Sequence, residues 1–366
     1  MERVFAEYLI ETPYDVRQAA AVLAGEQSSG TFVAVPGETE ELKQRFAARV
    51  EHIELLDLVN EPSIPGGKIS GKKYQKAKVK VSWSIENFGY NLPVLISTLQ
   101  GNLYEITQFT GLKLMDLELP DSFKNHYKGP QFGIKGSKVS CGVGSERPMI
   151  GTIIKPSVGM FPEETATLVQ TLIDAGIDFI KDDELMGSTA NSPFNERVKA
   201  IMKVIRNNEQ RTGKKVMYAF NISDEIDVMQ RKYDLILQEK GSCAMISVNS
   251  VGLAGTKKIC DNGQLVIHSV VTSIKSCLKP FLGGNEILPV VSSGQWGGQA
   301  FETYKRTQTT DLLYMAGGGI LAHPMGPKAG VNALQQAWEG AVDGSSIEET
   351  ANKHKEFAAS VKKFSK

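Results

Sequence analysis

The stretch DFIKDDELMG, at residues 178–187, joins the end of an apolar run to a cluster of charges. The run at 177–180 has the character of a buried strand, and Lys181, Asp182, Asp183 and Glu184 follow it directly. A buried strand that stops in one lysine and three carboxylates indicates either a binding site or a loop of solvated charges. The sequence on both sides of the stretch distinguishes these two interpretations.

Strand-like runs alternate with helix-like runs on both sides of this stretch. The predicted helices include residues 163–175, 195–211 and 225–240. Repeated strand–helix units predict parallel strands covered by helices, and their spacing of about 25–35 residues is that of a (β/α)8 barrel. The predicted strands are MIGTIIKP (149–156), IDFIKDD (177–183), KVMYAFN (215–221), CAMISVN (243–249), QLVIHS (264–269), EILPVVSS (286–293) and DLLYMAGG (311–318).

The number of predicted strands is seven, one fewer than a closed barrel needs. The fifth strand ends at His268 and Ser269 and runs without turn residues into 270–280, which is typical of a helix. One helix therefore stands where a loop, a helix, a strand and another loop are expected. Either the barrel is not closed, or about one strand–helix unit is missing from this chain.

The first 125 residues follow a different pattern. Alternating runs predict strands at 3–11, 76–86 and 112–120, and helices are predicted at 15–27 and 91–101. Strands and helices without regular alternation indicate a small α+β domain. We therefore expect an N-terminal α+β domain at 1–125 and a barrel domain at 126–366.

Composition excludes several classes of partner. Lys plus Arg and Asp plus Glu both number 41, so a zero net charge gives no reason to expect nucleic acid or an anionic membrane. The 4 cysteines form no C-x-x-C pair, which favours a reducing cytoplasm over a disulfide framework. The N-terminus lacks the features of a signal peptide, and no apolar run is long enough to span a membrane.

The barrel prediction places the polar strand ends together, because the active sites of such barrels lie at the C-terminal ends of the strands. These ends carry Lys155, residues 181–184, Asn221, Asn249, His268, SSGQWGG (292–298) and the glycines at 317–319. A common position for so many polar side chains favours a site over a solvated loop.

Each of these groups suits a particular chemistry. Asp183 and Glu184 offer the oxygen ligands that Mg²⁺ prefers, although the Lys181 ammonium is a poor neighbour for a cation unless it is modified. Lys155 could move protons, and the glycines at 317–319 could hold a phosphate. A surface lysine and ordinary turn glycines are simpler alternatives, and His268 and His323 are each compatible with a packed, hydrogen-bonded histidine.

Several ordered motifs resemble those of the RuBisCO large-chain superfamily. GTIIKPSVGM (151–160) and DAGIDFIKDDE (174–184) are similar to its Gly-x-x-Lys-Pro-Lys strand end and to its Lys-Asp-Asp-Glu segment. Counterparts over the rest of the chain are GEQSSGTF (25–32), LQGN (99–102), GPQFGI (129–134), SSGQWGG (292–298) and AGGGILAHPMGPKAG (316–330).

The resemblance implies an N-terminal ferredoxin-like α+β domain, a C-terminal TIM barrel and an obligate homodimer with shared sites. It implies that CO₂ carbamylates Lys181, which then binds Mg²⁺ together with Asp183 and Glu184, and that Lys155 moves protons. The further residues that it matches to family positions are Glu26, Thr31 and Asn102, which reach the partner's site, Ser293, Gly294, Gly317 and Gly318, which bind substrate or phosphate, and the catalytic His268.

The departures from the family pattern indicate a RuBisCO-like protein (form IV) rather than a carboxylase. The second lysine of Lys-Pro-Lys is Ser157, the family tryptophan is Phe32, and Gln295 replaces a glycine. The His-x-His-Arg stretch breaks off after His268. Residues 126–366, the predicted barrel, contain no Gly-Lys-x-x-Gly loop, which closes over the substrate in true carboxylases.

The function that the resemblance implies is Mg²⁺-dependent enolisation, with decarboxylation or transcarboxylation of a phosphorylated 3-oxo sugar acid. Two alternatives stay open: an enolase or isomerase of the methionine-salvage type, and a pseudoenzyme that keeps the fold and the dimer without catalysis. The intact residues Lys155, Lys181, Asp183 and Glu184 favour an active enzyme.

Overall fold

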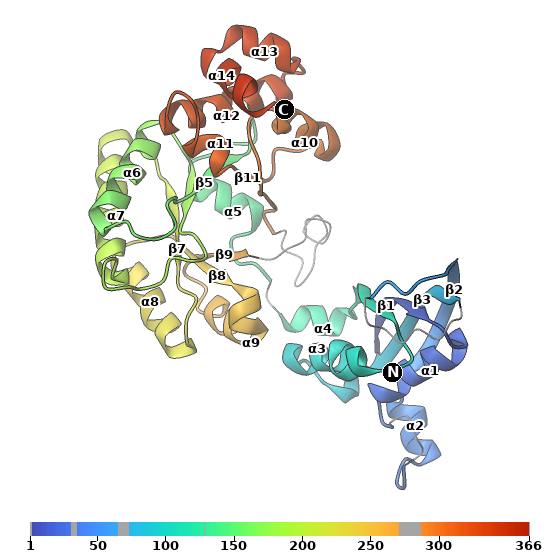
Figure 1. The fold of residues 1–366 in the computed structure, drawn as a ribbon. Helices are drawn as coiled ribbons and strands as arrows, with labels where there is room; N and C mark the ends of the chain where they lie inside the picture. Colours follow the sequence, from blue (N-terminus) through green and yellow to red (C-terminus); the bar gives the residue numbers. More distant parts are fainter. Residues whose placement is uncertain (1, 31–34, 65–72, 128, 271–286, 366) are drawn as a thin grey trace. The chain divides into compact units, whose positions relative to one another are not determined.

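The computed structural model describes residues 2–30, 35–64, 73–127, 129–270 and 287–365 (Figure 1). Thr31, Phe32 and nearly all of the predicted helix at 270–280 lie outside these ranges. The chain divides into two compact units, Met1–Tyr127 and Lys128–Lys366. Each unit is described by itself below.

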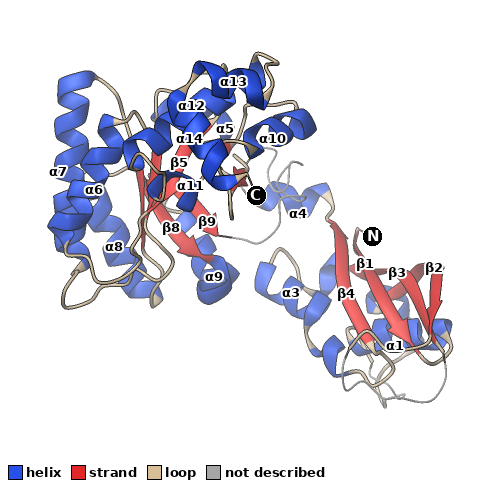
Figure 2. Ribbon diagram, turned by 45° about the horizontal axis from the view of Figure 1, so that its top comes forward, coloured by secondary structure: helices blue, strands red, loops and turns tan. Residues whose placement is uncertain are grey.

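The N-terminal unit has the expected ferredoxin-like α+β fold. Its antiparallel strands lie in the order β2-β3-β1-β4, side by side in Figure 2. The side chains of β1 alternate, so that Val4, Ala6, Tyr8 and Ile10 are buried. The elements are β1 (Arg3–Thr12), α1 (Val16–Glu26), α2 (Glu40–Phe46), β2 (Arg49–Val59), β3 (Tyr74–Ser84), η1 (Ile85–Asn87), α3 (Leu92–Gln100), η2 (Asn102–Glu105), β4 (Gly111–Glu118) and α4 (Asp121–His126).

The C-terminal unit contains a curled parallel sheet in the order β10-β11-β5-β6-β7-β8-β9. Figure 1 shows α6, α7 and α8 on the outer side of the curve. The strands are β5 (Met149–Ile153), β6 (Phe179–Lys181), β7 (Met217–Asn221), β8 (Cys243–Ser247), β9 (Val266–Val270), β10 (Val290–Val291) and β11 (Leu313–Met315). The helices are α5 (Gly133–Ser140), α6 (Pro162–Asp174), α7 (Phe194–Thr212), α8 (Ile226–Gln238), α9 (Val248–Cys260), α10 (Gln299–Thr307), α11 (Gly318–Leu321), α12 (Pro327–Val342), α13 (Ile347–Lys353) and α14 (Lys355–Phe364).

All seven strands predicted from the sequence are present, and the curled sheet is open. Strand β9 pairs with β8 and β10 pairs with β11, but within the described ranges no ladder joins β9 to β10. A closed barrel would have one more strand at this point, which is where the sequence leaves no room for one. The described strands therefore form an open parallel sheet that is curled like part of a (β/α)8 barrel.

Strand alternation sets which side chains enter the curve of the sheet. Phe179, Met217 and Met245 belong to the inner core, whereas Ile180 and Phe220 pack outward against the helices. Because side chains alternate along a strand, Lys181 lies on the same face as Phe179 and Asn221 on the same face as Met217. The inner face of the sheet thus ends in polar residues at the C-terminal ends of the strands.

No helix in the part of the chain that the structure describes is long and apolar enough to cross a membrane.

Candidate active site

Lys181 is the last residue of β6 and lies almost entirely out of solvent, with 6% of its surface exposed. Its Nζ donates to Glu184 Oε1 at 2.7 Å and to the Asp182 carbonyl at 3.0 Å, and it contacts Met245 Sδ at 3.3 Å. Lys181 therefore pairs directly with Glu184, one of the two carboxylates that are predicted to share its metal site.

Asp183 and Lys155 form a second pair beside the first. Lys155 Nζ lies 2.5 Å from Asp183 Oδ2 and also donates to Ser157 Oγ at 2.7 Å. Burial alone would raise the pKa of Asp183. The hydrogen bonds from Lys155 and from the Leu185 N–H, together with the charges of Lys155 and Lys181, lower the pKa by more than burial raises it. The pKa of Asp183 therefore lies below its ordinary value. This carboxylate is ionised at neutral pH and can act as a ligand.

The charges of these four side chains cancel, because two ammonium groups face two carboxylates. The described residues include no group of three or more His, Cys, Asp and Glu side chains that could hold a metal. Carbamylation of Lys181 would change its charge from positive to negative. The site would then carry three anionic oxygen donors against one ammonium, a donor set that suits Mg²⁺. The residues present therefore fit a metal site once Lys181 is modified, and not before.

Asp182 is fully buried and does not face the other site residues. Its carboxylate accepts hydrogen bonds from Tyr218 Oη at 2.6 Å, from the Asn221 N–H at 2.9 Å and from Arg197 at 3.3 Å. The sequence analysis missed Arg197 and Tyr218. One signal was available for Arg197, because it lies on the apolar stripe of α7 between Phe194 and Val198.

His268 faces the inside of the curled sheet from β9. Its ring lies 5.2 Å from the ring of Phe179, and its register partner on β8 is Met245. Burial lowers the pKa of His268 to about 3, and the positive charge of Lys181 contributes. The structure thus places a neutral imidazole on the same inner face as Lys181. His323 is instead a packing residue, since it contacts the Glu356 carbonyl and accepts from the Met325 N–H.

The loops after β10 and β11 lie against each other. Ser293 and Gly294 both have a φ of 69°, which for Ser293 is a strained conformation. Gln295 holds this turn, because its amide donates to the Ser293 carbonyl at 3.1 Å and accepts from Tyr314 Oη at 3.0 Å. A Cβ at Gly319 would lie only 2.5 Å from the Gln295 carbonyl oxygen. The turn at Ser293 and Gly294 therefore lies close to the glycine segment 317–319.

Glu26 and Asn102 lie at the same end of the N-terminal unit. Glu26 ends α1 and Asn102 begins η2. The side chain of Gln27 joins them, because its amide oxygen accepts from the Asn102 N–H at 3.0 Å and its NH₂ donates to the Ser97 and Thr98 carbonyls. A hollow of about 410 Å³ is lined by Glu26, Gln27, Ser28, Ser29, Phe46, Asn87, Val94, Ser97 and Thr98. Thr31, the third predicted residue of this group, is outside the described residues.

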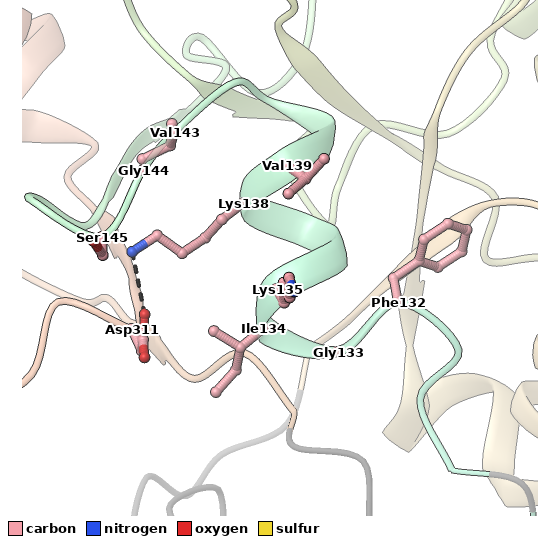
Figure 3. A pocket seen from close by; sticks show the side chains of 10 residues that line it. All are labelled: Phe132, Gly133, Ile134, Lys135, Lys138, Val139, Val143, Gly144, Ser145 and Asp311. Carbon is pink, nitrogen blue, oxygen red and sulfur yellow. Dashed lines mark hydrogen bonds and ion pairs between the residues drawn. The ribbon is translucent and has the colours of Figure 1, made fainter.

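A larger hollow of about 520 Å³ lies at the opposite end of the parallel sheet, next to residues that precede β5 and β11 (Figure 3). In it, Lys138 of α5 is paired with Asp311 at 3.2 Å. None of the candidate residues lines this hollow. Since catalysis on such sheets occurs where the strands end, the hollow at their beginning is not the candidate site.

The fold and this arrangement define a protein of the RuBisCO superfamily. Residues 2–123 match the family of the ribulose bisphosphate carboxylase large chain, N-terminal domain, and residues 141–275 and 275–364 match its catalytic domain. The chain belongs to this family. The two catalytic segments meet at residue 275, within the stretch where the strand count leaves one unit missing.

The similar curated proteins include enzymes named for 3-oxo-isoapionate 4-phosphate and ribulose bisphosphate carboxylase-like proteins. The chain is 44% identical to a 3-oxo-isoapionate-4-phosphate transcarboxylase/hydrolase of Xanthobacter autotrophicus, which covers 96% of this chain and 97% of the relative. It is 42% identical to a 3-oxo-isoapionate-4-phosphate decarboxylase of Rhizobium rhizogenes, with 98% and 97% covered. A crystal structure of a rubisco-like protein from Burkholderia fungorum superposes with a TM-score of 0.90 at 34% identity, over 100% of both chains.

Proposed function

We propose that this chain is a Mg²⁺-dependent enzyme that removes or transfers the carboxyl group of a phosphorylated 3-oxo sugar acid. The observation that carries the proposal is the cluster of Lys155, Lys181, Asp183 and Glu184 in a chain whose similar relatives are named for 3-oxo-isoapionate 4-phosphate. A pseudoenzyme would have no need to keep four interacting charges at its strand ends.

The chemistry of a 3-oxo acid fits these residues. When the bond to the carboxylate breaks, its electron pair passes to the oxo group and leaves an enolate, and the carboxyl group departs as CO₂. Mg²⁺, when bound by Asp183, Glu184 and carbamylated Lys181, would supply the electrophile that stabilises this negative charge. Lys155 is close to Asp183 and partly exposed, so its ammonium can donate the proton that the enolate carbon takes up.

The remaining predicted residues receive roles by their position. The phosphate group would lie against the adjoining loops that carry Ser293, Gly294, Gly317 and Gly318, where backbone N–H groups are available. His268 would contribute a neutral imidazole to the same inner face. Ser157 stands where the carboxylases have a second lysine, and this supports a substrate other than ribulose bisphosphate.

We further propose a homodimer in which Glu26, Thr31 and Asn102 complete the partner's site. Large apolar side chains are exposed on the loops that follow the strands, among them Leu185 at 71%, Val158 at 68% and Phe161 at 54%. Exposed apolar side chains around a site indicate a surface that another chain covers.

The test is conversion of 3-oxo-isoapionate 4-phosphate in the presence of Mg²⁺ and bicarbonate, followed by release of CO₂ and by proton NMR. We expect turnover by the wild type and a loss of at least about a hundredfold in Lys181→Ala and Glu184→Gln. Mn²⁺, used as a probe for Mg²⁺, should bind more tightly when bicarbonate is added. Unchanged metal binding in Lys181→Ala would contradict the proposed site.

Two further assays separate the alternatives. Ribulose bisphosphate with labelled CO₂ should give no labelled three-carbon acid, and its appearance would show a carboxylase. Turnover of a methionine-salvage diketone phosphate, without turnover of the sugar acid, would show an enolase instead. Metal binding without turnover of any phosphorylated substrate would favour a pseudoenzyme.

A further inference from the structure

A fully buried ion pair lies directly beneath the candidate site. Arg197 of α7 and Asp182 are both 0% exposed, and Nη2 of Arg197 lies 3.3 Å from Oδ2 of Asp182. Asp182 is flanked in sequence by Lys181 and Asp183, whose side chains form the site. A buried ion pair is weak evidence for added stability, because the cost of desolvating two charges offsets their attraction. Its position therefore points to another role.

Asp182 is attached to strand β7 by both its main chain and its side chain. Its N–H donates to the Ala219 carbonyl at 3.0 Å, and its carboxylate accepts from Tyr218 Oη at 2.6 Å and from the Asn221 N–H at 2.9 Å. Burial and the charge of Asp182 hold the pKa of Tyr218 well above its ordinary value, so the phenol remains a donor. The backbone N–H and the carboxylate of Asp182 are consequently both held against β7.

Two buried side chains then hold the loop that follows. Nη1 of Arg197 donates to the Gly187 carbonyl at 3.2 Å and to the Ser192 carbonyl at 3.1 Å. Nδ2 of Asn221 donates to the Glu184 carbonyl at 3.2 Å and to the Met186 carbonyl at 3.3 Å. Arg197 and Asn221 therefore hold four backbone carbonyls of residues 184–192 by hydrogen bonds. One of these carbonyls belongs to Glu184, a predicted metal ligand.

We propose that Asp182, Arg197, Tyr218 and Asn221 form a loop clamp that positions Lys181, Asp183 and Glu184 for metal binding. Arg197 and Tyr218 lie on the helix-covered side of the sheet with Asp182, and the Asn221 amide donates to loop carbonyls, so the four act as positioning residues. The two adjacent aspartates have opposite roles: Asp183 faces the metal, and Asp182 fixes the backbone that presents it. This inference rests on the proposed function, since it concerns the same metal site.

A purely structural role for these residues would lead to a different result when they are substituted. If Arg197 only attached α7 to the sheet, any change with the same effect on stability would have the same effect on the site. Lys232 offers the comparison, because it is buried to a similar degree and pairs with Asp224 at 2.8 Å. Its Nζ also lies 5.2 Å from the centre of the Phe194 ring, and Cζ of Arg197 lies 5.5 Å from the centre of the same ring.

The experiment uses the full-length protein and four variants. Tyr218→Phe removes one hydrogen bond from Asp182 and keeps the shape of the ring. Asp182→Asn with Arg197→Met removes both charges together, so that no unpaired charge remains buried. Lys232→Met is the matched control, and Glu184→Gln removes a proposed ligand. Three quantities are measured for each: Mn²⁺ affinity with bicarbonate by electron paramagnetic resonance, hydrogen exchange of the 184–192 amides, and the melting temperature.

We expect the double variant to bind Mn²⁺ about tenfold to a hundredfold more weakly, as for other residues that orient metal ligands. Tyr218→Phe should weaken binding several-fold. Both should exchange the 184–192 amides faster than the wild type. Lys232→Met should lower the melting temperature without changing either the affinity or the exchange of this loop.

The outcomes separate the clamp from the metal site itself. If the wild type and Glu184→Gln bind Mn²⁺ equally, the proposed metal site is wrong, and hydrogen exchange alone then judges the clamp. If Tyr218→Phe keeps both the wild-type affinity and the wild-type exchange of residues 184–192, the clamp is wrong. Should the double variant not fold, Tyr218→Phe decides by the same two readouts. A Lys232→Met variant that weakens Mn²⁺ binding as much as Tyr218→Phe would show a general effect of stability and overturn the inference.

Discussion

Asp182 and Asp183 are neighbours in sequence but lie in opposite environments. Asp182 is enclosed by Tyr218, Arg197 and backbone N–H groups, whereas Asp183 pairs with a partly exposed lysine. Their identity and their place after a strand were visible in the sequence. The partners that distinguish them were not, because Arg197 and Tyr218 belong to other elements and reach Asp182 only in the folded sheet.

Glu11 shows at the same scale how burial and hydrogen bonds set the charge of one side chain. It lies near the end of β1, and its carboxylate accepts from the Ser63 N–H at 2.7 Å and from Thr110 Oγ1 at 2.8 Å. Burial would raise the pKa of Glu11, but the hydrogen bonds from Ser63 and Thr110 and the charge of Lys76 outweigh it. The pKa lies below the ordinary value of 4.5.

The sign of this shift gives a prediction for acid stability. A carboxyl group whose pKa is lower in the folded state stabilises the fold above its ordinary pKa, and the contribution is lost as the pH falls through the folded value. The melting temperature of the N-terminal unit should therefore fall more for the wild type than for Glu11→Gln between about pH 5.5 and pH 3.5. Hydrogen exchange of β1 during heating measures it, and an equal fall in both proteins would contradict it.

At the scale of the element, parallel strands were predictable and the exposed edge strand β2 was not. Strands covered on both faces form continuous apolar runs, and all seven in the C-terminal unit could be located from such runs. Strand β2 (Arg49–Val59) has no buried residue, and its sequence RVEHIELLDLV shows no regular alternation of apolar and polar residues. The sequence also could not show that the loops after β10 and β11 pack together. Their close approach at Gly319 is to a backbone atom of Gln295, and a backbone atom leaves no pattern in the sequence.

Helix α11 offers two adjacent glycines with different surroundings. A Cβ at Gly319 would meet backbone at 2.5 Å, whereas a Cβ at Gly318 would meet nothing within 4 Å. Gly319→Ala should therefore cost about 1–3 kcal/mol of unfolding free energy. Gly318→Ala should change it by less than about 0.5 kcal/mol but raise KM for the phosphorylated substrate, because the methyl group enters the proposed phosphate site.

Urea denaturation and steady-state kinetics measure these two effects. Gly319→Ala also moves the turn at Ser293 and Gly294, so its KM should rise as well. A stable Gly319→Ala protein, or a Gly318→Ala protein with unchanged KM, would show that the loops do not have the proposed role.

At the scale of the whole molecule, the proposed site draws on two chains. Glu26 and Asn102 lie in the unit Met1–Tyr127, and Lys181 lies in the unit Lys128–Lys366. If each N-terminal unit completes its partner's site, a Glu26→Ala chain paired with a Lys181→Ala chain has one intact site of two. Each mutant homodimer has none.

Mixing the two inactive mutants under conditions of subunit exchange should therefore restore activity. Random pairing makes half of the dimers mixed, so about a quarter of wild-type activity is expected from closed two-fold symmetry. Wild-type chains taken through the same exchange serve as the control. If they stay active and the mixture does not recover, Glu26 acts within its own chain.

The balance of charge among Lys155, Lys181, Asp183 and Glu184 separates folding from metal loading. Many small metal sites leave their ligands unpaired without the ion, so that the chain unfolds when a chelator removes it. Here two ammonium groups take the place of the cation, and no carboxylate is left uncompensated. Treatment with EDTA in buffer freed of CO₂ should abolish turnover but leave the circular dichroism spectrum unchanged, and restoring Mg²⁺ and bicarbonate should return activity without refolding. With the proposed carbamylation, the protein would be folded before it is activated, and its active fraction would follow the supply of CO₂ and metal within the lifetime of a single folded chain.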